Sequence, residues 1–283
     1  MRQEIPALVS TQWLEDHLSA PDIRIIDASW HMPASGRDAR SEFETMHIPG
    51  ATFFDIDEIC DSDNPLPHML PSSEKMSSRM RQLGLGDGNR IIVYDSSNVC
   101  SSARVWWMLK IFGHHDVAVL DGGLRKWTME ERPVEDLPAK TRERHFTARV
   151  DTTLIRNCEQ IKQNLDTQKE QIVDARSPAR FSGQEQDPRP GIRSGHIPNA
   201  LNVPFSKLLN ESDYTFKSPD EIRTIFEKAG VDLNKPITTS CGSGITAAVL
   251  TLGLYMVGHR HVALYDGSWS EWGAKEDCPV ATE

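Results

Sequence analysis

Short runs of β-branched and aliphatic residues alternate along this chain with longer stretches whose apolar positions recur at helical spacing. The strand-like runs occur in both halves, at 23–26, 90–94, 117–120, 171–174, 236–240 and 262–265. Helical stretches follow two of them, at 102–112 and 246–256. Apolar strands separated by helices are typical of a parallel sheet that is covered by helices on both faces. The pattern therefore predicts an α/β fold.

The two halves of the chain are related, because four blocks of similar sequence recur in the same order. The matching blocks are RIIDA (24–28) with IVDAR (172–176), HIPGA (47–51) with HIPNA (196–200), RIIVYD (90–95) with PITTSC (236–241), and GHHDVAVLDGGLRKW (113–127) with GHRHVALYDGSWSEW (258–272). A repeat of this length is a duplicated domain rather than a solenoid unit. We therefore predict two domains, at 1–135 and 154–283. The charged, proline-bearing segment 136–153 is expected to link them.

Composition restricts the classes of partner. The chain has 283 residues, with 31 Lys and Arg against 41 Asp and Glu, so its formal charge is −10. An acidic chain without a basic run offers no electrostatic footprint for nucleic acid or for an anionic membrane surface. No apolar segment approaches the length of a membrane span, and the N-terminal stretch lacks the apolar core of a secretion signal. We expect a cytoplasmic protein that binds neither nucleic acid nor membrane.

The cysteines and histidines indicate no metal centre. The five cysteines are Cys60, Cys100, Cys158, Cys241 and Cys278. They are odd in number and far apart, which favours neither a disulfide framework nor a zinc site. Two histidine pairs, at 114–115 and 259–261, have no cysteine or carboxylate at ligand spacing. We predict reduced thiols, no metal and no cofactor.

One cysteine stands where chemistry is expected. Cys241 follows the run 236–240, opens the loop Cys-Gly-Ser-Gly and precedes the helical stretch 246–256. The unpaired N–H groups and positive dipole end of a helix N-terminus favour an anion, and the thiolate is the nucleophilic form of cysteine. Cys241 is therefore a candidate nucleophile. The matching residue of the first half, Asp95, has no thiol, so we expect that half to be an inactive copy.

Two other interpretations of this loop are weaker. Cys241 could be a small buried hydrophobic residue, but a core cysteine needs no flanking glycines. A tyrosine-phosphatase-like reaction needs an arginine six positions after the cysteine, where this chain has Ala247. We expect the loop to bind its ligand through the backbone of Gly242, Gly244, Ile245, Thr246 and Ala247.

The motifs together resemble a known family. The paired HIPGA and HIPNA blocks, DGGLRKW and DGSWSEW, and the CGSGITA loop resemble the two-domain rhodanese family of sulfurtransferases, and CGSG resembles its 3-mercaptopyruvate sulfurtransferase branch. The resemblance implies two tandem rhodanese-like domains, each with a five-stranded parallel sheet flanked by helices. It also implies a reaction in which sulfur passes from 3-mercaptopyruvate to a Cys241 persulfide, with release of pyruvate. The sulfur then passes to a thiol such as thioredoxin or glutathione, or to cyanide.

The loop bears on the choice of sulfur donor. In thiosulfate sulfurtransferases the corresponding loop resembles Cys-Arg-Lys-Gly, whose two cations suit a dianionic donor. Here Gly242 and Ser243 hold those positions and are neutral, which favours 3-mercaptopyruvate with its single carboxylate. A thiosulfate:cyanide sulfurtransferase and a non-catalytic rhodanese-type binding module are the alternatives.

The resemblance also assigns roles to five side chains. Arg180 in SPARF and Arg189 in DPRPG match the substrate contacts of the family and would clamp the carboxylate and the keto oxygen. Ser243, with His68 in PHMLP and Asp57 in FFDIDE, would form a Ser-His-Asp relay that moves a proton. Nothing in the local spacing predicts that these last three residues meet.

Other conspicuous residues are expected to be structural. His47 and His196 recur in both halves, including the half without the nucleophile, so we expect them to hold a strand-to-turn junction by hydrogen bonding. Arg193 is a weaker candidate for substrate contact and is left outside the core site. Five tryptophans on or beside predicted core elements are expected to be packing anchors: Trp106, Trp107, Trp127, Trp269 and Trp272.

Overall fold

The computed structural model describes residues 5–282, so residues 1–4 of the predicted first domain and Glu283 lie outside the described residues. The chain divides into two compact units. The first contains the described residues up to Asp61 together with Leu70–Asp151 and Asn210–Phe216. The second contains Ser62–Met69, Thr152–Leu209 and the residues from Lys217 onwards. Each unit therefore includes one short segment that the other half of the sequence supplies.

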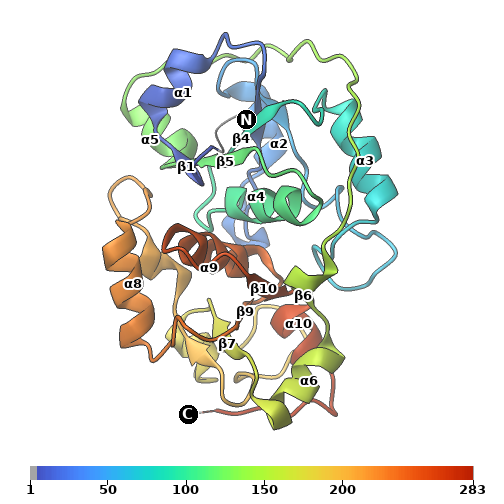
Figure 1. Ribbon diagram of the computed structural model, residues 1–283, viewed down its shortest axis with the longest axis vertical. Coiled ribbons are helices and arrows are strands. Elements are labelled where there is room, and N and C mark those ends of the chain that lie inside the picture. The colour runs from blue at the N-terminus through green and yellow to red at the C-terminus, as the bar shows by residue number, and fades with distance from the viewer. Residues whose placement is uncertain (1–4, 283) are drawn as a thin grey trace. The chain divides into compact units, whose positions relative to one another are not determined.

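The first unit is built on a five-stranded parallel sheet with the strand order β1-β5-β4-β2-β3. Its strands are β1 (Leu8–Val9), β2 (Ile23–Asp27), β3 (Thr52–Phe53), β4 (Arg90–Tyr94) and β5 (Val117–Leu120). Its helices are α1 (Thr11–His17), the 3₁₀ turn η1 (Pro33–Ser35), α2 (Ala39–Thr45), α3 (Ser73–Gln82), α4 (Ser102–Ile111) and α5 (Gly123–Met129) (Figure 1).

The second unit repeats this sheet with the order β6-β10-β9-β7-β8, again parallel throughout. Its strands are β6 (Ile155–Arg156), β7 (Gln171–Asp174), β8 (Leu201–Asn202), β9 (Ile237–Ser240) and β10 (Val262–Tyr265). Its helices are η2 (Thr152–Leu154), α6 (Cys158–Thr167), α7 (Pro178–Phe181), η3 (Phe205–Leu208), α8 (Pro219–Lys228), α9 (Ile245–Met256) and α10 (Ser268–Trp272). The predicted fold class of two α/β units with five-stranded parallel sheets is confirmed.

The central strands match the apolar runs of the sequence because helices bury them on both faces. Four of the five residues of β4 and all four residues of β5 and of β10 are buried. Helices α4 and α9 are also buried over most of their circumference, which explains why both read as continuous apolar stretches. The edge strands β1, β3, β6 and β8 have two residues each, too few for a periodic pattern, and the sequence analysis missed them.

The two units share details of packing that reflect the duplication. In the first, the His47 ring stacks on Phe43 at 4.2 Å and its Nδ1 lies 2.7 Å from the Phe43 carbonyl oxygen. In the second, His196 stacks on Phe181 at 3.8 Å, with its Nδ1 2.8 Å from the Phe181 carbonyl oxygen. Each histidine also forms a backbone bridge, to Glu135 and to Ala281 respectively. The five tryptophans expected to be packing anchors are all buried to 2% exposure or less.

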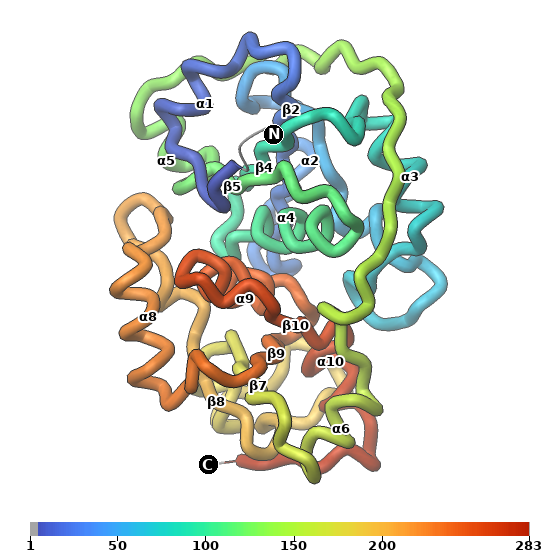
Figure 2. Tube along the Cα trace, in the orientation of Figure 1, coloured from blue at the N-terminus to red at the C-terminus, as the bar shows by residue number. Residues whose placement is uncertain are grey.

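The segment that follows α5 packs against the first unit as an extended chain. Residues 138–150 contain no helix or strand. The Phe146 side chain is buried, and its carbonyl oxygen accepts hydrogen bonds from the Arg81 guanidinium at 3.0 and 3.1 Å. The Arg149 and Asp151 N–H groups donate to carbonyl oxygens at the end of α4 and just beyond it. The tube in Figure 2 shows this green segment running past α3.

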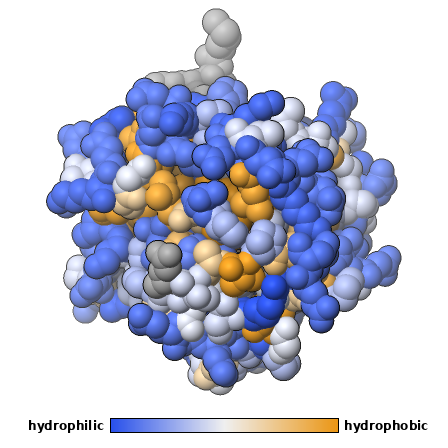
Figure 3. All heavy atoms as spheres, turned by 90° about the horizontal axis from the view of Figure 1, so that it is seen from below, coloured by the Kyte–Doolittle hydropathy of each residue, from blue (hydrophilic) through white to orange (hydrophobic). Residues whose placement is uncertain are grey.

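The face of the molecule seen from below is mostly hydrophilic. Figure 3 shows hydrophilic side chains over most of the face that it presents, with apolar side chains gathered in smaller patches between them. Among the residues that the structure describes, no helix is both long enough and apolar enough to cross a membrane.

Candidate active site

Cys241 lies at the carboxyl end of the central strand β9, directly before helix α9. Its side chain is 2% exposed, and its Sγ accepts a hydrogen bond from the Gly244 N–H at 3.1 Å. Gly244 is the N-cap of α9 and has a φ of +83°, a left-handed conformation that glycine adopts without strain. The loop therefore turns an N–H group of the helix start toward the sulfur, as an anionic sulfur requires.

A second loop supports the first from the start of α10. The Cys241 N–H donates to Ser268 Oγ at 3.2 Å, and the Trp269 N–H donates to the Cys241 carbonyl oxygen at 2.9 Å. The Ser270 N–H and hydroxyl both donate to the Gly242 carbonyl oxygen, at 2.9 and 2.5 Å. Ser268 and Ser270 were not predicted as site residues from the sequence. They are two of the places where DGSWSEW differs from DGGLRKW, and that difference is a signal that could have found them.

Arg180 and Arg189 lie beside the loop, on the side of Gly242. A Cβ built on Gly242 would lie 3.3 Å from Arg189 Nη1 and 3.5 Å from Arg180 Nη2. The two guanidinium groups therefore converge on the residue next to the thiol, and a side chain at position 242 would press against them. The structure brings these two predicted substrate contacts together with Cys241.

Asp187 holds both arginines and was missed by the sequence analysis. Its carboxylate is 2% exposed and accepts from Arg180 Nη2 at 2.5 Å and from Arg189 Nη1 at 3.3 Å. It also accepts the Arg189 backbone N–H at 3.0 Å. A buried carboxylate between two like charges keeps them in one place, since the guanidinium groups would otherwise repel each other. Its position inside DPRPG, two residues before Arg189, is the signal that could have revealed it.

The structure also joins Ser243 to His68. Ser243 Oγ lies 3.0 Å from His68 Nδ1, and both side chains are buried. His68 has a φ of +62° and belongs to the short segment Ser62–Met69 that forms part of the second unit. Asp57 belongs to the first unit, where its Oδ2 accepts from the Trp30 indole N–H at 3.0 Å. Two members of the expected relay are therefore in contact, and the part assigned to Asp57 stays a prediction.

In the first unit a carboxylate takes the position of the thiol. Asp95 accepts hydrogen bonds from the Ser97 N–H at 2.8 Å, the Ser97 hydroxyl at 2.7 Å and the Ser102 N–H at the start of α4 at 2.9 Å. The helix N-terminus is thus neutralised by the chain's own carboxylate. Cys100 lies nearby, but burial and then the charge of Asp95 raise the pKa of its thiol well above the ordinary value.

Other predicted sites fall outside this region. Arg193 donates to the carbonyl oxygens of Trp272, Gly273 and Cys278 at 2.9–3.1 Å, which fits a structural role. Within residues 5–282, no group of three or more His, Cys, Asp or Glu side chains could hold a metal ion.

A model of the rhodanese-like domain matches residues 10–130 and 157–275. This chain belongs to the rhodanese family. Among its relatives, 3-mercaptopyruvate sulfurtransferase of Homo sapiens is 45% identical over 272 residues, which cover 94% of this chain and 91% of the relative. Thiosulfate sulfurtransferase of Gallus gallus is 43% identical over 272 residues, with coverage of 94% and 93%. The crystal structure of SseA from Escherichia coli, a 3-mercaptopyruvate sulfotransferase, matches with a TM-score of 0.86 at 39% identity, covering 94% of this chain and 99% of that one.

Proposed function

We propose that this rhodanese-family chain transfers the sulfur of 3-mercaptopyruvate, through a persulfide on Cys241, to a thiol acceptor or to cyanide, and releases pyruvate. The observation that supports this most directly is the Cys241 loop itself. Its next two residues, Gly242 and Ser243, carry no charge, and the guanidinium groups of Arg180 and Arg189 lie beside it. A donor with one carboxylate and one ketone fits two forked hydrogen-bond donors, without further cations inside the loop.

The first half-reaction moves one sulfur atom. The Cys241 thiolate attacks the donor sulfur, so that an S–S bond forms and the donor C–S bond breaks, with the bonding pair passing into the enolate of pyruvate. The proton of the donor thiol ends on the methyl carbon of pyruvate. The Gly244 N–H already donates to the cysteine sulfur and would stabilise the anionic persulfide. In the second half-reaction an acceptor thiolate or cyanide attacks the outer sulfur, and Cys241 leaves as the thiolate.

Ser243 and His68 are proposed to handle the proton of the first step. Their hydroxyl and imidazole are 3.0 Å apart, and Ser243 lies two residues from the nucleophile. A hydroxyl that is hydrogen-bonded to a base can polarise the donor or relay a proton to the enolate. Asp57 is proposed as the third member of this relay.

Thiosulfate is the second candidate donor, because a relative that is 43% identical carries the name thiosulfate sulfurtransferase. The neutral loop argues against it, since thiosulfate is a dianion. Thioredoxin, glutathione and cyanide remain the proposed acceptors. A cytoplasmic location also remains a prediction.

The test compares two donors and two cysteines. Pyruvate release from 3-mercaptopyruvate with a dithiol acceptor is measured beside thiocyanate formation from thiosulfate and cyanide, for wild type, Cys241→Ser and Cys100→Ser. We expect strong pyruvate release that is abolished by Cys241→Ser and retained by Cys100→Ser, with weak thiosulfate turnover. Dominant thiosulfate turnover would overturn the argument from the neutral loop. The absence of Cys241-dependent turnover of either donor would favour the non-catalytic rhodanese-type binding module.

A further inference from the structure

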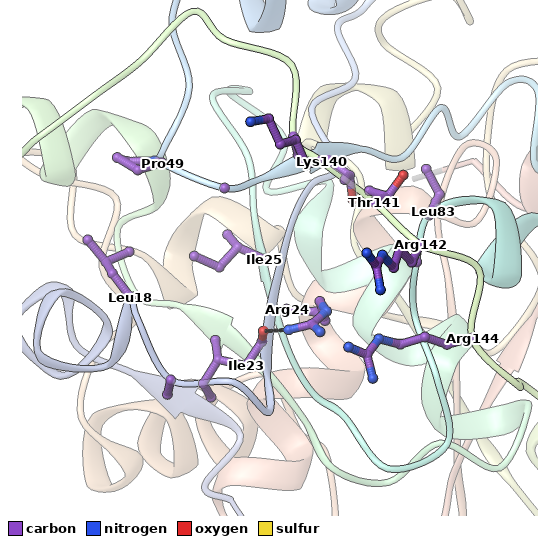
Figure 4. Close-up of a pocket in the computed structure, with 15 residues that line it drawn as sticks. Leu18, Ile23, Arg24, Ile25, Pro49, Leu83, Lys140, Thr141, Arg142 and Arg144 are labelled. Carbon is purple, nitrogen blue, oxygen red and sulfur yellow. Dashed lines mark hydrogen bonds between the residues drawn. The ribbon is translucent and has the colours of Figure 1, made fainter.

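A hollow in the first unit gathers positive charge. It has a volume of about 360 Å³, which lies in the range of small-molecule sites. Four cations line it: Arg24 from β2, and Lys140, Arg142 and Arg144 from the extended segment after α5. We call these four residues and the hollow that they line the basic pocket. Figure 4 shows the guanidinium groups of Arg24, Arg142 and Arg144 on one side of it.

Within the described residues, no ion pair neutralises the four cations of the basic pocket. No carboxylate lines it. Among residues 5–282, the side chains of Lys140, Arg142 and Arg144 make no hydrogen bond or ion pair. Arg24 donates through Nη1 to the Pro21 carbonyl oxygen at 3.1 Å, and burial followed by the charge of Arg144 lowers its pKa. In a chain with a net charge of −10, such a cluster creates a local positive field that attracts anions.

A hydroxyl adds a second, independent indication of a polar ligand. Thr52 on β3 lines the same hollow, and its buried Oγ1 makes no hydrogen bond within the described residues. A buried hydroxyl without a partner costs free energy, so a ligand oxygen that reached it would remove that cost. The pocket thus combines charged donors with a buried neutral hydroxyl on one of its lining residues.

The opposite side of the pocket is apolar. Leu18, Ile25 and Pro49 line it there, and Figure 4 shows them across from the three guanidinium groups. A ligand that fills the hollow therefore has a multiply charged oxyanion at one end and an apolar body at the other. Arginine forks match the oxygens of a phosphoryl group in geometry as well as charge.

We propose that the basic pocket binds an organic phosphate, with the phosphoryl groups on Arg24, Arg142 and Arg144 and the apolar body against Leu18 and Ile25. This site lies wholly in the first unit and does not depend on the function proposed for Cys241.

Isothermal titration calorimetry on the full chain tests the site with pyrophosphate, adenosine diphosphate and adenosine. We expect adenosine diphosphate to bind tighter than pyrophosphate, and adenosine to bind at least tenfold more weakly than adenosine diphosphate. Arg142→Gln and Arg144→Gln should each weaken adenosine diphosphate binding about tenfold or more. The matched control, Arg149→Gln, removes the same charge from the same segment outside the pocket and should change the affinity less than twofold.

Each other outcome overturns part or all of this proposal. Absence of phosphate binding at millimolar concentration, or equal weakening by all three variants, would reduce the site to general surface charge. Pyrophosphate that binds as tightly as adenosine diphosphate would remove the role of the apolar side. Melting temperatures of the variants, measured alongside, separate a lost site from a lost fold.

A different observation supports a second proposal, at the N-terminus of α6 in the second unit. Cys158 is the first residue of α6, and Cys278 lies in the C-terminal segment that passes beside this helix (Figures 1 and 2). Their Sγ atoms are 3.6 Å apart, and both side chains are buried. A disulfide has a sulfur–sulfur distance of about 2.05 Å, so the two sulfurs need to approach by only about 1.5 Å for a bond to form.

We infer that Cys158 and Cys278 form an intramolecular disulfide when the protein meets a peroxide. One thiolate attacks a peroxide oxygen and becomes a sulfenic acid as hydroxide leaves. The second thiol then attacks that sulfur and water leaves, so that two thiols and one hydrogen peroxide give one disulfide and two waters. Burial and the neighbouring Cys158 raise the pKa of Cys278 to about 12, which makes the reaction slow at neutral pH and faster in alkali.

Peptide mass spectrometry after hydrogen peroxide treatment tests this disulfide. We expect a linked peptide pair that contains Cys158 and Cys278, lighter by two hydrogens, and formed faster at pH 9 than at pH 7. Cys158→Ala should abolish the pair, whereas Cys100→Ala, which removes another buried thiol, should leave it unchanged. Oxidation of Cys278 to the sulfinic acid without a link, or a link to any other cysteine, would overturn the proposal.

Discussion

Asp27 and Asp174 occupy matching positions in the two units but have different electrostatic partners. Both are buried, at 1% and 2% exposure, and each accepts a backbone N–H two residues ahead, from Ser29 at 2.8 Å and from Arg176 at 2.9 Å. Asp174 also pairs with the Arg176 guanidinium at 2.7 Å. Asp27 has no such countercharge at position 29, which is a serine. The same substitution should therefore have opposite effects in the two units.

The magnitude for Asp27 follows from its pKa. Burial raises this pKa from an ordinary value of 3.8 to about 6. Between these two pH values the folded protein keeps a proton that the unfolded chain releases, so stability falls as the pH rises through that window. The total loss is about 3 kcal/mol, complete above pH 6. Asp27→Asn cannot ionise, so its unfolding free energy relative to wild type should rise by about 2 kcal/mol between pH 4 and pH 8, because part of the total loss lies below pH 4.

Asp174→Asn is the matched comparison. It leaves the buried Arg176 guanidinium without a countercharge, although Arg176 still donates to the Gly195 carbonyl oxygen at 2.8 Å and lies 4.4 Å from the Trp269 ring. Breaking a buried ion pair on one side costs about 3–5 kcal/mol, so this variant should be strongly destabilised at pH 8.

Urea unfolding followed by tryptophan fluorescence at pH 4 and pH 8 measures both effects. Comparison of each variant with wild type at the same pH cancels the titration of all other groups. A pH-independent difference for Asp27→Asn would refute the reasoning that its charge is uncompensated. A neutral effect of Asp174→Asn at pH 8 would refute the contrast between the two units.

Two further predictions concern the active site. Asp187→Asn should lower kcat/KM for 3-mercaptopyruvate about tenfold, mainly through KM, because the amide cannot accept from both Arg180 and Arg189 and the two cations separate; unchanged pyruvate-release kinetics would contradict this. Ser243→Ala should lower kcat about tenfold with little change in KM, because it removes the hydroxyl that contacts His68. Rates measured across pH would check this. If Ser243→Ala changed KM alone and left kcat unchanged at every pH, the contact with His68 would have a structural role and no part in proton transfer.

The fold could be predicted from the sequence because its central elements are determined locally. The strands β4, β5, β7 and β10 coincide with the apolar runs, since a strand buried on both faces must be apolar throughout. The short edge strands escaped because their register depends on the neighbouring strand rather than on their own composition. Cys241 was predicted for a local reason as well, since the strand, the glycines and the helix around it are contiguous.

Contacts between residues that are far apart in the sequence could not be predicted from it, because no local pattern records which distant side chains meet. His68 and Ser243 are 175 residues apart, and Cys158 and Cys278 are 120 apart. The basic pocket likewise joins Arg24 to residues 140–144.

The sequence by itself determined the duplication, the α/β architecture and the candidate nucleophile Cys241. Each of these follows from contiguous or periodically repeated positions. Only the tertiary structure decided that Asp187 holds both arginines, that serines at the start of α10 support the loop, and that Asp95 accepts a hydrogen bond from the N-terminus of α4. The physical reason is that local patterns record which face of an element is buried. Which side chains then meet depends on how the chain turns between elements, and no periodicity encodes that.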